Sequence, residues 1–117
     1  MSEPNAVEVH LPLHPRVLLV LSALLEGPLH GAALLDRVEE LSSGTLRPGP
    51  ATLYRTLDRL EADGLIRAVD ADPDGSPGRP GRPYEPTGLG RRVTGAEFRR
   101  LSALRSEVAP ADPGDGR

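Results

Sequence analysis

Apolar residues recur with helical spacing in three stretches of the first half of the chain. The first stretch begins at Pro15 and ends at Glu26-Gly27-Pro28, and its apolar members are Val17, Leu18, Leu21, Leu24 and Leu25. The second runs from about His30 to Leu41, with inward positions expected at Leu34, Leu35, Val38 and Leu41. The third, from about Pro50 to Asp63, places Leu53, Leu57 and Leu60 at i, i+4 and i+7. The pattern therefore predicts three helices, with a brief extended piece at residues 45–47 before the third.

The second half of the chain predicts a hairpin and then a long helix. Residues 65–69 and 83–86 are expected to form two short strands, the second at an edge because its prolines lack ladder donors. The residues between them are dense in Asp, Gly, Pro and Arg, a composition without regular structure. Thr87 is expected to cap the final helix, whose apolar positions are Leu89, Val93, Phe98, Leu101, Leu104 and Val108.

These elements predict a mainly α (α+β) fold, a winged helix-turn-helix. Three N-terminal helices and a β-hairpin wing would form a winged-helix domain over residues 13–86, followed by a C-terminal helix over residues 87–108. Residues 1–12 are polar without a clear period, which predicts a flexible arm, and residues 109–117 have the composition of a disordered tail. The last helix has little to pack against in so small a domain. We expect its six apolar residues to meet a second copy in a twofold dimer. For Leu101, Leu104 and Val108, packing inside one chain is the alternative.

The third predicted helix has the pattern of a recognition helix. Pro50 suits its first position, and Gly64 suits the left-handed position just past its end. One face is apolar and anchors the helix, and a second, exposed face consists of Thr52, Arg55, Thr56 and Arg59. Such a face can meet phosphates and base edges in a major groove. The alternative is an ordinary solvated face on which nearby aspartates pair with the arginines.

Charge supports this interpretation only weakly. All 14 basic residues are Arg, against 17 acids, and the net charge is −3. Residues 47–92, which include the third helix, hold 8 Arg and 7 acids, whereas residues 1–46 hold 2 Arg and 6 acids. Basic residues are thus relatively concentrated where DNA would bind. The Arg-only usage suits bidentate contacts to phosphate or guanine, and a GC-rich coding bias explains it at least as well.

Composition argues against several other classes of protein. No apolar run is long enough for a membrane span, and the first residues lack the basic and apolar regions of a signal peptide. The absence of cysteine excludes disulfides and thiol chemistry, which fits a cytoplasmic location. Three scattered histidines make no metal site, and we expect His30 to be structural. No nucleophile–base set or phosphate-cradling Gly loop is present, so neither an enzyme nor a cofactor is expected.

Four segments together carry a family resemblance. Residues 24–31 read Leu-Leu-Glu-Gly-Pro-Leu-His-Gly, and residues 84–91 read Tyr-Glu-Pro-Thr-Gly-Leu-Gly-Arg. With residues 46–55 and 57–66, they resemble the PadR family of bacterial transcriptional regulators. The four segments are similar to that family's link between its first two helices, both parts of its recognition helix, and its exit from the wing. The single short C-terminal helix resembles the family's shorter branch.

The resemblance implies a homodimeric repressor that binds a near-palindromic operator in double-stranded DNA and is released by a small molecule or a stress signal. The residues expected to contact DNA are Arg47, Pro50, Thr52, Tyr54, Arg55, Arg59, Arg79 and Arg82. In the family the Tyr54 hydroxyl would reach the DNA backbone, with packing as the alternative. Arg79 and Arg82, in the loop between the strands, would contact the minor groove or phosphates as the tip of a wing does. Three aspartates in the same loop would repel DNA. Ala32 departs from the family's usual aromatic residue, and the absence of Trp argues against its drug-stacking site.

The leading hypothesis is therefore a sequence-specific DNA-binding regulator. The alternative is a winged-helix module that binds other proteins and has lost specific DNA binding, a reading motivated by the weak basic balance and the acidic loop.

Overall fold

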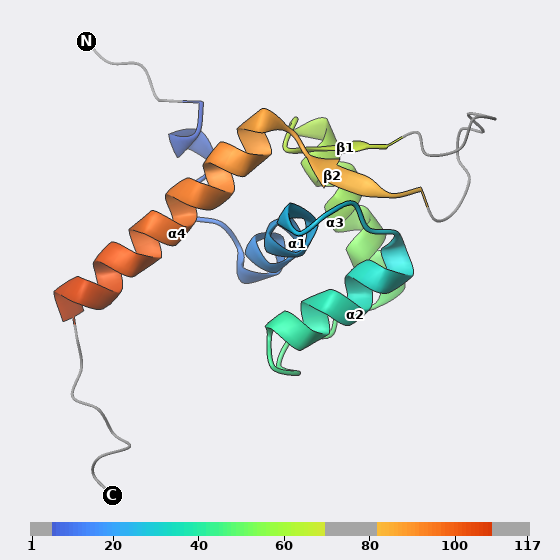
Figure 1. Cartoon of the computed structure of the whole chain (residues 1–117), viewed down its shortest axis with the longest axis horizontal. Helices are drawn as coiled ribbons and strands as arrows, with labels where there is room; N and C mark the ends of the chain where they lie inside the picture. Colours follow the sequence, from blue (N-terminus) through green and yellow to red (C-terminus); the bar gives the residue numbers. More distant parts are fainter. Residues whose placement is uncertain (1–5, 70–81, 109–117) are drawn as a thin grey trace, which may run out of the picture.

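The computed structural model describes residues 6–69 and 82–108 (Figure 1). After a short 3-10 helix at Glu8–His10, this part of the chain holds four α-helices and a two-stranded antiparallel sheet. The elements are α1 (Pro15–Leu25), α2 (Gly31–Leu41), α3 (Pro50–Ala62), β1 (Ile66–Ala68), β2 (Tyr84–Pro86) and α4 (Gly88–Val108). α2 packs against both α1 and α3, and α4 leaves the hairpin and packs against α1 (Figure 1). This mainly helical arrangement is the winged-helix fold that the sequence predicts.

Part of the segment expected to be a flexible arm is folded. Val7 and Leu11, on either side of the 3-10 helix, are partly buried against the core. The N–H of Leu13 then donates a 3.0 Å hydrogen bond to a carboxylate oxygen of Glu97 in α4. Isolated apolar contacts of this kind leave no periodic signal, so the sequence pattern did not reveal them. The first five residues and residues 109–117, the predicted tail, lie outside the described part of the chain.

The core lies where α1, α2, α3 and the start of α4 meet. Its buried apolar residues are Val20, Leu21, Ala23, Leu24, Leu34, Val38, Leu53, Leu57, Leu60, Leu65, Ile66 and Val93. The expected inward faces of α2 and α3 are confirmed, with Leu35 and Leu41 partly buried at the edge. α1 differs because it is covered by α2, β2 and α4 together. Val20 and Ala23 are buried there, whereas the expected Leu18 and Leu25 are only half-buried.

The hairpin is tied to the helices at an unpredicted point. Ile66, Arg67 and Ala68 pair with Pro86, Glu85 and Tyr84. Leu29, in the link between α1 and α2, forms one antiparallel β-bridge with Tyr84. The Leu29 N–H donates to the Tyr84 carbonyl at 3.3 Å, and the Tyr84 N–H donates to the Leu29 carbonyl at 3.1 Å. Residues 45–47, predicted as a brief extended piece, form a bend followed by irregular chain. The Ser42 hydroxyl instead accepts a 2.9 Å hydrogen bond from the N–H of Leu46 and holds that segment in a turn.

α4 begins inside the core and ends outside it. The Thr87 hydroxyl accepts a 3.0 Å hydrogen bond from the N–H of Gly90, which confirms the predicted cap. A Cβ on Gly90 would collide with the carbonyl oxygen of Leu65, so only glycine allows this close approach. Gly90, Val93, Thr94 and Glu97 are buried. From Phe98 to Val108 every residue is exposed.

This division corrects two positions of the expected dimer seam. Val93 is fully buried within its own chain, and Leu89 is partly buried against the same core. Both residues therefore pack against the core of their own chain. The remaining four are exposed by 37–62%: Phe98, Leu101, Leu104 and Val108.

Candidate nucleic-acid interface

α3 begins and ends as the sequence predicts, and both ends position its exposed face. Gly49 precedes it as the N-cap, and Pro50 is its first residue. At the other end Gly64 takes a φ of +78°. The N–H groups of Gly64 and Leu65 donate to the carbonyls of Glu61 and Leu60, at 3.0 and 2.9 Å. This Schellman closure leads the chain directly into β1, so α3 and the hairpin are held as one unit.

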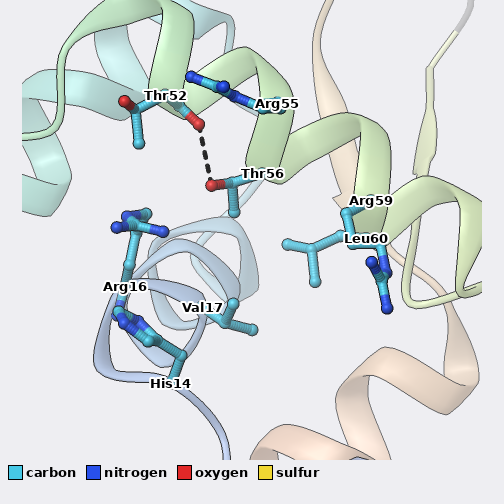
Figure 2. A pocket seen from close by; sticks show the side chains of 8 residues that line it. All are labelled: His14, Arg16, Val17, Thr52, Arg55, Thr56, Arg59 and Leu60. Atoms are coloured by element: carbon cyan, nitrogen blue, oxygen red, sulfur yellow. Dashed lines mark hydrogen bonds between the residues drawn. The ribbon is translucent and has the colours of Figure 1, made fainter.

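The exposed edge of α3 carries three of the eight candidate DNA contacts, Thr52, Arg55 and Arg59. Arg55 and Arg59 are exposed and Thr52 is half-buried. Thr56, expected on the same exposed face, is only 9% exposed. Its hydroxyl donates a 2.9 Å hydrogen bond to the Thr52 carbonyl (Figure 2). Because its hydroxyl proton is used within its own helix, Thr56 offers no donor on this face, although it lines the adjoining cleft.

Two of the candidate arginines already have carboxylate partners. Arg47 Nε lies 3.3 Å from a Glu39 oxygen, and Arg59 Nε lies 3.3 Å from an Asp63 oxygen. Both arginine side chains are more than two-thirds exposed, so water screens these pairs and leaves them weak. Arg55 has no carboxylate partner among the described residues. Within residues 6–69 and 82–108, its charge is therefore the one on the α3 edge that no carboxylate compensates.

Tyr54 lies at the junction of α2 and α3. Its side chain packs against Gly31, so closely that a Cβ on that glycine would collide with the phenol oxygen. Tyr54 is nevertheless 41% exposed. Gly31, the first residue of α2, thus makes room for the ring. Pro50, one turn before Tyr54, is exposed at the start of α3.

The opposite edge of α3 is acidic and faces the hairpin. Burial raises the pKa of Tyr84 in β2, and the nearby carboxylates of Glu61 and Asp58 raise it further, while Arg82 lowers it. Arg82 is half-buried close to the start of β2. The other candidate wing arginine, Arg79, lies outside the described residues. The structure therefore brings Thr52 and Arg55 together with Arg59, and sets Arg82 apart near the hairpin.

Arg16 is a residue that the sequence pattern did not single out. It lies in the first turn of α1 and lines a cleft of about 430 Å³ together with Thr52, Arg55 and Arg59 (Figure 2). In the sequence, Arg16 is a lone charge at a helix start, 34 residues before the first residue of α3. No spacing rule links such distant positions, so only the fold could reveal the grouping.

The histidines act locally in this structure. His14 caps α1, because its Nδ1 accepts a 3.0 Å hydrogen bond from the N–H of Arg16. His30 occupies the N-cap position of α2 without a side-chain cap. Within residues 6–69 and 82–108, no group of three or more His, Asp or Glu side chains could hold a metal ion. In the same part of the chain, no helix combines the length and the apolar character that crossing a membrane requires.

Comparison with known proteins decides the family. Residues 20–96 match the profile of the transcriptional regulator PadR-like family. The chain belongs to this family. The PadR-like chain is similar to a transcriptional regulator of Mycobacterium tuberculosis, with 40% identity over 93 residues, covering 76% of this chain and 78% of that protein. It is also 38% identical over 91 residues, 78% of its length, to an uncharacterized 37.1 kDa protein in a transposon of Streptomyces fradiae, of which it spans only 24%.

A solved structure supports the fold of this PadR-like chain. A transcriptional regulator from Clostridium thermocellum superposes with a TM-score of 0.63, covering 93% of this chain and 96% of that one. The identity between the two is 16%, so this likeness concerns the fold alone. The family consists of transcriptional regulators rather than enzymes, in agreement with the sequence-based expectation.

Proposed function

We propose that this PadR-like regulator binds a near-palindromic site in double-stranded DNA as a homodimer, with α3 in the major groove, and represses transcription in the cytoplasm. The observation that carries the proposal is the exposed edge of α3. Thr52 and Arg55 lie on a helix whose other side is anchored by the buried Leu53, Leu57 and Leu60. A rigidly held edge of hydroxyl and guanidinium groups suits phosphates and base edges.

The dimer part of the proposal rests on α4. Its second half exposes a stripe of large apolar side chains that the described chain leaves uncovered. A twofold axis through this stripe would present two copies of α3. Winged and helix-turn-helix dimers of this kind read two half-sites about one helical turn of DNA apart, which is why the operator is expected to be near-palindromic.

Fluorescence anisotropy of the purified chain tests the proposal, using duplexes that tile its own upstream region at two salt concentrations. We expect one near-palindromic duplex to bind tightly and to lose affinity steeply as salt rises, because phosphate contacts release counterions. Weak, equal binding to every duplex would contradict specific recognition. That outcome would favour the alternative, a winged-helix module that binds other proteins.

A further inference from the structure

The cleft between the start of α1 and the edge of α3 gathers positive charge. Its eight lining residues are His14, Arg16, Val17, Thr52, Arg55, Thr56, Arg59 and Leu60 (Figure 2). None of these eight residues is acidic. We propose that this cleft holds a phosphate of the DNA backbone and that Arg16 is the contact supplied by α1, an inference that rests on the proposed DNA-binding function.

Two of the three arginines that line the cleft have no carboxylate partner in the described part of the chain, while Arg59 has only its weak, exposed pair with Asp63. Neither Arg16 nor Arg55 has a carboxylate partner among residues 6–69 and 82–108. In Figure 2 the Arg16 side chain extends from α1 toward Thr52, and Arg55 lies beside Thr52 on α3. Two guanidinium groups in one cleft repel each other, and an anion between them would turn that repulsion into charge-assisted hydrogen bonds.

A neutral donor completes the cleft. The Thr52 hydroxyl is a hydrogen-bond donor on the α3 wall. On the α1 wall, His14 Nδ1 accepts the Arg16 N–H at 3.0 Å, and the Arg16 guanidinium supplies the donors. A phosphate oxygen accepts from all of these donors. Donors therefore stand on both walls of the cleft.

A second cleft in the same chain shows that an arginine alone does not make such a site. The cleft of about 330 Å³ beside α2 is lined by Glu26, Asp36 and Glu40 as well as Arg37. Arg37 is already paired there, with N–O distances of 2.6 Å to Glu26 and 3.1 Å to Glu40. The carboxylates of that cleft neutralise its arginine. The cleft beside α3 lacks such groups among its lining residues and keeps its positive charge for an outside anion.

The position of the cleft indicates a backbone contact rather than a base contact. Arg16 stands on α1, beside the helix proposed to enter the groove, where a DNA strand would pass along α3. Contacts to phosphate position a protein on DNA without reading sequence. Arg16 is therefore inferred to strengthen binding to all duplexes alike.

The salt dependence of DNA binding by Arg16→Ala tests this inference. We expect the slope of log K against log salt to become less steep by about 0.9 per protomer. Affinity should fall roughly tenfold, the effect of about one charge-assisted hydrogen bond, for the operator and for an unrelated duplex alike. Arg16→Lys should retain most of the slope. Arg99→Ala, which removes an exposed arginine from α4, serves as the matched control and should bind like the unchanged chain.

An unchanged salt slope in Arg16→Ala would overturn the inference, and the proposed function would stand if Arg55→Ala still weakens binding. A loss of affinity without a change in slope would also overturn it, because Arg16 would then act by packing. Absence of salt-sensitive DNA binding in the unchanged protein would overturn the proposed function and this inference with it.

Discussion

α3 and the second half of α4 each present a face that the described residues leave uncovered, and the two faces differ in chemistry. On α3 the uncovered edge carries Thr52, Arg55 and Arg59. On α4 the uncovered residues include Phe98, Leu101, Leu104 and Val108. Hydroxyl and guanidinium groups suit phosphates, whereas a stripe of large apolar side chains is stabilised by another apolar surface. The comparison suggests two different partners, nucleic acid for α3 and a second copy of the chain for α4.

The change along α4 occurs at Glu97. This carboxylate is 1% exposed, accepts the N–H of Leu13, and pairs with Arg100 at 2.6 and 2.9 Å. Val93, one turn earlier, is part of the core, and Phe98 is already exposed. The helix up to Glu97 is sufficient to cover the core of its own chain. The residues beyond it are the part of α4 that forms the proposed dimer interface.

The largest effect is expected from placing charge in the α4 stripe. Leu101→Asp combined with Leu104→Asp should abolish the proposed dimer, since burying one leucine is worth about 1.5–3 kcal/mol and two are lost per protomer. Sedimentation velocity over a range of concentrations would show the change from dimer to monomer. Ser106→Asp, on the opposite side of α4, should leave the dimer intact. A dimer that survives the double substitution would place the interface elsewhere.

A second effect is expected on the α3 face. Arg55→Ala should weaken operator binding by about 1–3 kcal/mol if Arg55 meets a base edge, and should leave helix content and dimerisation unchanged. Anisotropy titrations measure the affinity, with Arg99→Ala as an arginine control outside this face. Affinity equal to that of the unchanged protein would remove Arg55 from the contact set.

Replacing two glycines of α4 by alanine should change the free energy of unfolding in opposite directions. Gly90→Ala places a Cβ against the Leu65 carbonyl and should lower the free energy of unfolding by about 1–3 kcal/mol through overpacking. At Gly95 an added Cβ meets only Arg99 at an ordinary 3.5 Å, so Gly95→Ala should stabilise the helix by about 0.5–1 kcal/mol. Thermal or urea unfolding distinguishes them. Equal effects would mean that α4 does not approach the domain at Gly90.

The smallest effect concerns the pH dependence of stability. The hydrogen bond from Arg100 lowers the pKa of Glu97, and the bond from Leu13 acts in the same direction. A lowered pKa contributes stability that is present above the ordinary value of about 4.3 and is lost as pH falls through the lowered pKa. The stability difference between the unchanged chain and Glu97→Gln should therefore shrink as pH drops below about 4. Urea unfolding at several pH values measures it, and a constant difference would contradict the role assigned to this carboxylate.

Local features of the fold could be predicted from the sequence. Pro50, Gly64 and Thr87 act through groups a few residues away, so their effects on helix ends are visible in the local pattern. The apolar face of α3 is likewise set by a local period. Contacts between distant residues could not be predicted in this way. The β-bridge between Leu29 and Tyr84 and the hydrogen bond between Leu13 and Glu97 correspond to no periodic pattern in the sequence.

In the candidate sites, too, contacts between distant residues could not be predicted from the sequence. Spacing placed Thr52, Arg55 and Arg59 on one edge, but could not show that Arg16 lines the same cleft. Spacing also could not show that Val93 is buried and Leu101 exposed, because both belong to one apolar stripe on α4. The first part of that stripe packs against the core, and the second part extends beyond it. Which residues an apolar stripe meets depends on where neighbouring elements end, and that is settled only by the fold.

Chemical-shift mapping of the labelled chain, titrated with its tightest-binding duplex, tests whether α3 binds DNA. We expect backbone amide signals to change at Thr52, Arg55 and Arg59 in α3 and at Arg16 in α1, while those of Leu101 and Leu104 stay in place. Changes confined to the second half of α4, or absent from α3, would contradict the assignment of α3 as the DNA-binding element.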